Sequence, residues 1–227
     1  MTAAAGPRAA SIVVGVATAL VILALAILPF LTPAWIGFAQ DRADAAAWTG
    51  YQPQDLQSAT NALLHDLVVG PPNFDVVVAG APVLVERERA HLRDVRGVFA
   101  ALAALVAVAL VALVVLVARA RRSAWAWRAV RRGALGLVGV TVLLAAVAAV
   151  AFDAAFEVFH RLFFAGGTYT FDPATDRLVQ LFPYQLWFET TIAVGAVMLV
   201  LALVTAGWAG RRAEHLSGPA ATGALSR

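Results

Sequence analysis

The sequence predicts an all-α polytopic membrane protein with four transmembrane helices, and three observations support this fold class. The chain of 227 residues is 61% hydrophobic. Its mean hydropathy of +0.80 is too high for a soluble domain of ordinary size. Four apolar runs reach the roughly 20 residues that a helix needs to cross a bilayer, and a helix satisfies its own backbone groups there. These runs are 11–31, 97–118, 134–152 and 188–209.

Arginines are distributed unevenly over the segments that join these runs. Six of the 17 positive charges lie in RARRSAWAWRAVRR, between the second and third runs, which contains no acid. Segments 32–96 and 153–189 contain thirteen of the fourteen acidic residues. Because positive segments remain in the cytoplasm, we expect both termini inside and two outer loops, a long one (32–96) and a shorter one (153–187). This asymmetry accounts for the pI near 10.2 without a nucleic-acid partner, which would need a basic groove with aromatic platforms.

The first apolar run follows Arg8, as the apolar core of a secretory signal would. Its length exceeds the usual core of about 7–15 residues, and no clean small-x-small cleavage site follows it. We therefore expect a retained helix. The domain prediction is one membrane domain over residues 1–210, with 211–227 as a disordered cytoplasmic tail.

The first outer loop, 32–96, is long enough to fold over the membrane helices. An amphipathic helix is predicted for PQDLQSATNALLHDLVV, which begins at Pro53, places leucines on one face and stops at 70–72, Gly-Pro-Pro. A small hairpin or extended chain is predicted around Gly80, where FDVVV and PVLV are β-branched. From Glu86 the helix formers of ERERAHLRDVR continue without a breaker, so we expect this helix to enter the second run directly.

The second outer loop leaves the third run through DAAFEVFHRLFF. It has turn signals at Gly166-Gly167 and at Asp172-Pro173. The chain then re-enters the membrane through FPYQLWFE. Each outer loop therefore carries ionisable side chains close to the end of an apolar run.

Of the four histidines, His91 and His160 are the candidates for chemistry. His215 lies in the predicted tail, and His65 lies on the polar face of the first-loop helix, where a solvated side chain is expected. At a rise of 1.5 Å per residue, His91 lies roughly 9 Å outside the second run, and His160 lies roughly 10 Å beyond the end of the third. The two imidazoles are therefore predicted at similar heights in the outer headgroup layer, on different helices.

Carboxylates accompany both histidines at helical spacing. Glu88 and Asp94 lie three residues to either side of His91, on one face. Asp153 and Glu157 share a face with the second histidine, and an ionisable group at the edge of a span usually points into the protein or a wet cavity. A neighbouring carboxylate can fix an imidazole tautomer and raise its basicity.

Other interpretations of these residues stay open at this point. Interfacial histidines and arginines can simply extend toward lipid headgroups, and the phenylalanines can form an ordinary aromatic belt. A metal site built from the two histidines with Glu157 and Asp153 is conceivable, although the sequence has no HExxH pair. An acyl-enzyme is disfavoured because the chain has no cysteine and Ser58, its only outer serine, lacks a Gly-x-Ser-x-Gly setting. General acid–base catalysis on groups that the substrate supplies is the chemistry that fits better.

Three motif blocks resemble one known family when taken together. ERERAHLRDVR precedes a span, and FHRLFF and FDPATDRLVQLFP follow in order. With four spans and a long first outer loop, they resemble the four-helix bacterial lipoprotein intramolecular transacylases over most of the chain. The resemblance implies transfer of the sn-2 O-acyl chain of a diacylglyceryl-cysteine lipoprotein to its own N-terminal α-amine, which gives a lyso-form lipoprotein.

The resemblance also implies roles for individual residues. His91 and His160 become the catalytic pair, and no metal or cofactor is expected. The supporting or substrate-positioning residues are Arg87, Glu88, Asp94, Arg96, Asp153, Glu157, Arg161, Asp172 and Asp176. The acyl path is assigned to Phe156, Phe159, Phe163 and Phe164.

The resemblance further implies the cellular setting. The expected partners are diacylglyceryl-modified lipoproteins and membrane lipid, with the active site at the extracytoplasmic face of a bacterial plasma membrane. Two alternatives from other classes remain. One is a non-catalytic membrane scaffold or accessory protein, and the other is a metal-dependent membrane lipid hydrolase.

Overall fold

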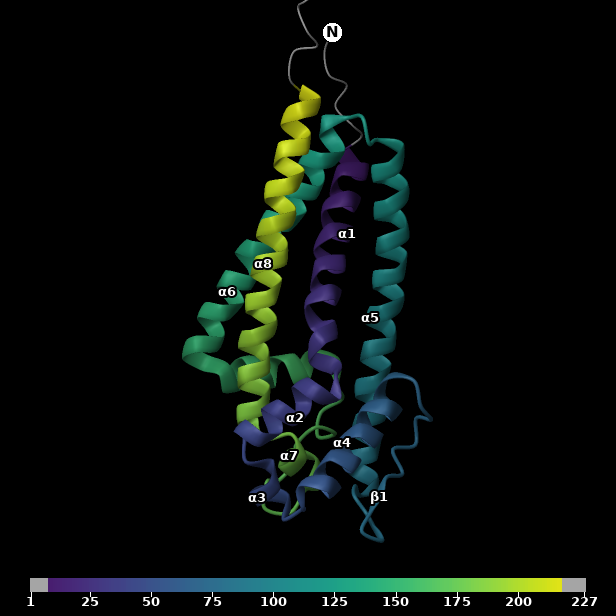
Figure 1. Cartoon of the computed structure of the whole chain (residues 1–227), viewed down its shortest axis with the longest axis vertical. Coiled ribbons are helices and arrows are strands. Elements are labelled where there is room, and N and C mark those ends of the chain that lie inside the picture. The colour runs from purple at the N-terminus through teal and green to yellow at the C-terminus, as the bar shows by residue number, and fades with distance from the viewer. Residues whose placement is uncertain (1–7, 218–227) are drawn as a thin grey trace, which may run out of the picture. The chain divides into compact units, whose positions relative to one another are not determined.

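The computed structural model describes residues 8–217, which are helical almost throughout (Figure 1). Four helices are long and apolar enough to cross a membrane, which confirms the predicted all-helical protein with four such helices. These four are α1 (Arg8–Ile27, extended by the 3₁₀ helix η1, Leu28–Leu31), α5 (Glu86–Arg119), α6 (Ala124–Phe163) and α8 (Tyr184–Ser217). The shorter helices are α2 (Pro33–Arg42), α3 (Ala45–Thr49), α4 (Pro53–Val68) and α7 (Arg177–Leu181).

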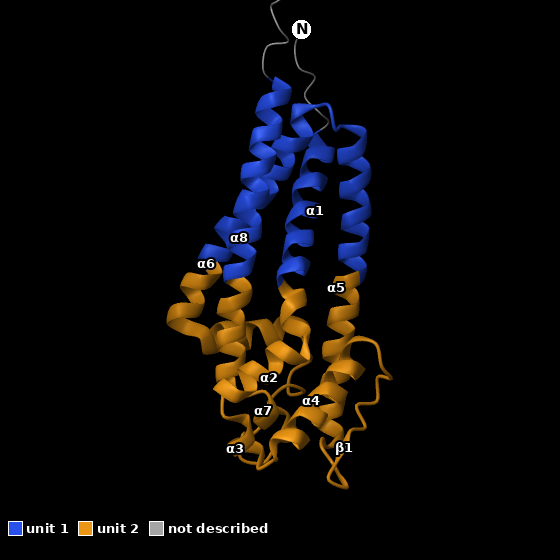
Figure 2. Cartoon of the chain, viewed as in Figure 1, with its two compact units in different colours: residues 1–26, 104–143, 196–227 blue, residues 27–103, 144–195 orange. Residues whose placement is uncertain are grey.

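Contacts within the chain define two compact units (Figure 2). The described part of unit 1 comprises residues 8–26, 104–143 and 196–217. Unit 2 comprises residues 27–103 and 144–195. Each of the four long helices therefore contributes residues to both units.

Small residues allow the helices of unit 1 to pack closely. Ala134, Ala202 and Ala206 form a buried cluster with Ile22. The tightest approach joins α1 and α6 at Gly15 and Gly133. A Cβ atom added to Gly133 would overlap the carbonyl oxygen of Gly15 and lie 2.7 Å from its Cα. The two backbones can pack at this distance only because Gly133 has no side chain, whereas a Cβ on Gly15 would make ordinary contacts at 3.5 Å or more.

Unit 2 has its own apolar core. Helix α4 begins at Pro53 and buries Leu56 and Leu63, which confirms the predicted amphipathic helix. Phe74, which follows α4, and Leu181, which belongs to α7, are fully buried in the same cluster. The strands β1 (Val77–Val78) and β2 (Ala81–Pro82) pair antiparallel, so the first of the two predicted alternatives, a small hairpin, is the one found. Its turn has positive φ at Ala79 and Gly80, as a two-residue hairpin turn requires.

Helix α5 runs without interruption from Glu86, as predicted, whereas α6 does not. Ala151 has φ −152° and ψ 48°, which are not helical angles. The ribbon of α6 changes direction toward the C-terminal end of this helix (Figure 1). The sequence has neither proline nor glycine at this point, so the break was not predicted. The height assigned to His160 assumed a straight helix, and that assumption was wrong.

The end of α8 also differs from the sequence expectation. The helix continues to Ser217, so residues 211–217 are helical where a disordered tail was predicted. Residues 218–227 of that tail lie outside the described residues, as do residues 1–7.

The glycine contact in unit 1 gives a stability prediction. Gly133→Ala should lower the thermal unfolding temperature in detergent by about 5 °C or more, because the added methyl group forces α1 and α6 apart. Gly139→Ala is the matched control on the same helix, since a Cβ there meets nothing within 4 Å. Equal unfolding temperatures for the two variants, measured by intrinsic tryptophan fluorescence, would contradict the packing.

Candidate functional site

The structure brings the two predicted histidines together in unit 2. His91 lies near the start of α5, and His160 lies in the part of α6 that follows the break. Their ring centroids are 6.2 Å apart and the rings are stacked at 22°. His91 is 7% exposed, and His160 is half-buried. The two imidazoles are close enough to act on one small group of atoms.

Aromatic rings enclose the histidine pair. Phe164 contacts both imidazoles, with ring centroids 4.9 Å from His91 and 5.5 Å from His160. Phe171 approaches His91 to 5.4 Å. Tyr169 lies 5.2 Å from His160. Neither Tyr169 nor Phe171 was a predicted site residue, although Phe171 begins the last motif block and Tyr169 lies in the six residues before it.

The ring nitrogens of the two histidines have different surroundings. Nδ1 of His160 lies 2.7 Å from the carbonyl oxygen of Phe156. Because a carbonyl can only accept, this Nδ1 carries the proton, and in the neutral ring Nε2 presents a lone pair. Nδ1 of His91 is buried and has no hydrogen-bond partner among the described residues. A buried nitrogen left unbonded is costly, so this atom is suited to bond a group that enters the site.

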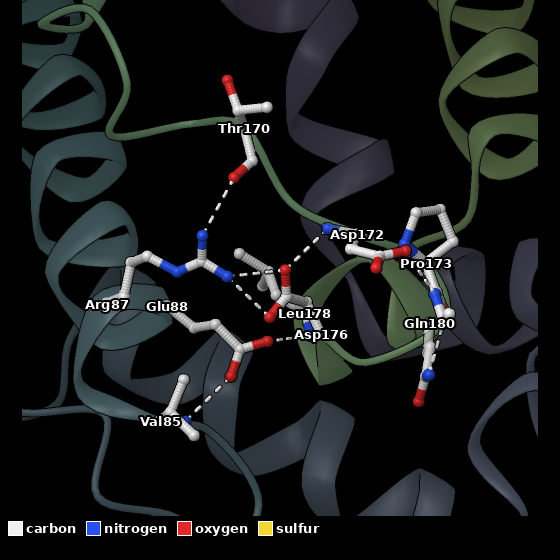
Figure 3. Close-up of polar contacts among 10 residues, drawn as sticks. Val85, Arg87, Glu88, Thr170, Asp172, Pro173, Asp176, Leu178 and Gln180 are labelled. Carbon is white, nitrogen blue, oxygen red and sulfur yellow. Dashed lines mark hydrogen bonds and ion pairs between the residues drawn. The ribbon is translucent and has the colours of Figure 1, made fainter.

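The carboxylate of Glu88, a predicted supporting residue of His91, bonds to the backbone and not to that imidazole. Glu88 is 1% exposed, and its two oxygens accept hydrogen bonds from backbone N–H groups (Figure 3). The N–H of Val85 donates at 2.8 Å and that of Leu178 at 2.6 Å. Glu88 therefore joins the start of α5 to α7 and positions His91 through the helix backbone.

Arg87 and Asp176 organise the segment between α6 and α7 beside this contact (Figure 3). Nη2 of Arg87 donates to both carboxylate oxygens of Asp176 at 2.7 Å. Asp176 also accepts from the backbone N–H of Asp172 at 2.6 Å, and Arg87 donates to the carbonyl of Thr170 at 3.3 Å. The guanidinium lies 5.0 Å from the ring of Phe171. These contacts hold the segment that brings Phe171 against His91.

Several predicted supporting residues lie outside this contact network. Glu157 pairs with Arg161 at 2.7 Å and accepts a hydrogen bond from the hydroxyl of Tyr169 at 3.3 Å. Arg96 donates to backbone carbonyls at the end of α4, among them Gly70 at 2.6 Å. Asp94 is exposed and, within residues 8–217, makes no side-chain hydrogen bond. None of the three bonds to either imidazole in that part of the chain.

Asp153 and the predicted acyl-path residues are placed as follows. Asp153 is exposed. Phe164 is buried, whereas Phe159 and Phe163 are about half exposed on the outer face of α6. Two hollows of unit 2, of about 480 Å³ and about 260 Å³, are lined by other residues. Within residues 8–217, no three His, Asp or Glu side chains group as metal ligands would.

Comparison with known proteins gives one family and one fold. A family model described as "Lipoprotein intramolecular transacylase Lit" matches residues 12–187. The in meso structure of the membrane-integral Lit from Bacillus cereus has a TM-score of 0.77 and 16% identity, and the match covers 92% of this chain and 96% of that one.

A structure of the same Bacillus cereus protein with one histidine mutated to arginine has a TM-score of 0.72 and 17% identity, and covers 92% of both chains. At these identities the likeness shows the fold alone. No curated protein matches the chain.

The buried carboxylate gives a prediction about stability. Glu88→Gln should lower the thermal unfolding temperature by about 3–10 °C, because an amide has one acceptor oxygen for two N–H donors. Glu86→Gln is the matched control two residues earlier, on the exposed surface. It should have a much smaller effect, since the ion pairs of Glu86 with Arg89 and Arg93 are solvated. Equal losses, measured by scanning fluorimetry in detergent, would show that Glu88 does not fasten the helix.

Proposed function

The chain belongs to the lipoprotein intramolecular transacylase family and is a multi-pass membrane transacylase, and on that premise we propose that His91 and His160 catalyse its acyl transfer. The proposed reaction moves the sn-2 acyl chain of a diacylglyceryl-cysteine lipoprotein to the α-amine of the same cysteine. The observation that carries the proposal is the stacked imidazole pair at 6.2 Å. The product of the proposed reaction is a lyso-form, N-acylated lipoprotein.

Such a reaction needs no nucleophile from the protein. The substrate contains both the ester and the amine, so holding it in a reactive conformation makes the attack intramolecular. The amine nitrogen forms a bond to the ester carbonyl carbon, and the bond from that carbon to the glyceryl oxygen breaks. One proton passes from the amine to the glyceryl oxygen. The protein therefore has to supply a proton acceptor, a proton donor and a hydrogen bond to the tetrahedral oxyanion.

The surroundings of the two rings suggest how these roles are divided. Nε2 of His160 accepts the amine proton, because Nδ1 of this ring is committed to the carbonyl of Phe156. His91 donates a hydrogen bond through its unpartnered Nδ1 to the developing oxyanion. The proton that His160 took from the amine then passes to the departing glyceryl oxygen, which restores His160. Phe164, in contact with both, excludes water that would otherwise hydrolyse the ester.

The outer face of α6 suits an acyl chain. Phe159, Leu162 and Phe163 are 47%, 74% and 51% exposed, so an apolar surface runs along the helix that carries His160. We infer that the acyl chains of the substrate lie along this surface, in the bilayer. The arginine asymmetry of the loops supports an orientation with both termini in the cytoplasm and the histidines at the extracytoplasmic face of the plasma membrane.

The pair can be tested in a bacterium that makes only diacylated lipoproteins. Expression of the full chain should yield N-acyl lyso-lipopeptides, detected by mass spectrometry. His91→Ala or His160→Ala should lower their formation by about 10²–10⁴-fold, because the first removes a hydrogen bond to the oxyanion and the second removes the proton-transfer group. His65→Ala changes an exposed histidine of α4 and should leave the product unchanged.

Protein amounts in the membrane fraction have to be measured in parallel. Normal lyso-product from both variants at normal protein amounts would refute the catalytic pair. Loss of the protein itself, with full activity per remaining molecule, would instead give the two histidines a structural role. Release of free fatty acid that a chelator abolishes would indicate a metal-dependent hydrolase.

A further inference from the structure

The charges of the two units are balanced in different ways. All six ion pairs between arginines and carboxylates in the described chain lie in unit 2. The described residues of unit 1 contain nine arginines and one acidic residue, Glu214. Nine positive charges against one negative charge leave a net charge of +8 with His215 neutral. The described part of unit 1 does not supply the counter-charges that its arginines need.

Most of these arginines gather at one end of unit 1. The end of α5, the start of α6 and the end of α8 lie together there (Figure 1). Arg128 of α6 donates to the hydroxyl of Ser217 of α8 at 3.3 Å. Arg132 donates to the hydroxyl of Ser11 of α1 at 3.1 Å. The side-chain hydrogen-bond partners of Arg128 and Arg132 are thus neutral hydroxyl groups.

Two of the guanidinium groups lie over a surface that has no side chains. A Cβ atom on Gly210 would lie 3.4 Å from Cδ and Nε of Arg131, and one on Gly207 would lie 3.8 Å from Nη1 of Arg211. Positions three residues apart on a helix have Cβ atoms about 5–6 Å apart. Arg131 of α6 therefore lies against Gly210, and Arg211 of α8 lies against Gly207, one helical turn away on α8.

Aromatic residues indicate the depth of this surface in the membrane. Trp127 and Trp208 pack edge to face with centroids 4.9 Å apart. Arg212 lies 5.8 Å from the ring of Trp127. Tryptophan and arginine together at the ends of spanning helices are typical of the headgroup layer. The anion available at that depth is the phosphate of a phospholipid.

We propose that Arg131 and Arg211 bind the phosphate of an anionic phospholipid over Gly207 and Gly210. Guanidinium groups suit phosphate because they donate in a planar fork. The net charge of +8 selects a headgroup with a net negative charge over a zwitterionic one, whose ammonium group it repels. The inference stands on unit 1 alone and is independent of the transacylation chemistry.

The test measures lipid binding to the full chain by native mass spectrometry in detergent. Phosphatidylglycerol should be retained in preference to phosphatidylcholine of the same acyl chains. The double variant R131Q/R211Q should bind phosphatidylglycerol about 25-fold more weakly, at about fivefold per arginine. R121Q/R122Q, which removes the same charge at the same end of unit 1, should bind like the unaltered protein.

Three results would overturn the proposal. Equal weakening by R121Q/R122Q would show a diffuse positive field and no defined site. Equal retention of phosphatidylcholine would show that lipid charge is not recognised. Displacement of phosphatidylglycerol by inorganic phosphate at the same concentration would show a site for a free anion.

A second variant covers the case in which R131Q/R211Q does not fold, as judged by circular dichroism and gel filtration. R131K/R211K retains the charge and loses the planar fork. Weaker phosphatidylglycerol binding by this folded variant supports the site, and unchanged binding overturns it.

Discussion

Two backbone N–H groups share the buried carboxylate of Glu88, and this contact fixes the segment from which His91 projects. A carboxylate that is 1% exposed requires donors in place of water. The donors belong to Val85, just before α5, and to Leu178 of α7, so the requirement joins segments 90 residues apart in sequence. His91 lies one helical turn after Glu88. Its position is therefore set by the hydrogen-bonding needs of a side chain that does not touch it.

The second imidazole depends on a backbone feature of another kind. The break at Ala151 ends the straight part of α6 and gives the following segment its own direction. His160 is then held by the carbonyl of Phe156 on one side and by Phe164, shared with His91, on the other. One ring is thus oriented by hydrogen bonding and both are enclosed by aromatic packing. The two rings therefore differ in their hydrogen bonding, since Nδ1 of His160 has a carbonyl partner and Nδ1 of His91 has none among the described residues.

Hydropathy, helix formers and turn residues were sufficient to predict the four long helices, α4, the hairpin and the uninterrupted α5, because each depends on neighbours in sequence. The meeting of the histidines was also expected, although through a straight α6 that does not exist. Helical spacing placed Asp94 on the same face as His91, yet such spacing does not predict whether the two side chains form a hydrogen bond. Helical spacing could not predict the hydrogen-bond partner of Glu88, since Leu178 lies 90 residues away in sequence. Nothing in the sequence indicated that Tyr169 lies beside His160, except its position between two motif blocks.

The contact between Gly15 and Gly133 has a consequence for how the protein is made. The two glycines are separated by 118 residues, and ribosomes add roughly 5–20 residues per second. The first helix therefore waits roughly 6–24 s in the bilayer before its glycine surface meets the third spanning helix. During this interval most of the first extracytoplasmic loop proposed above has already been synthesised. Association of the helices is thus a late event that follows insertion, and α1 has to persist in lipid on its own hydrophobicity until then.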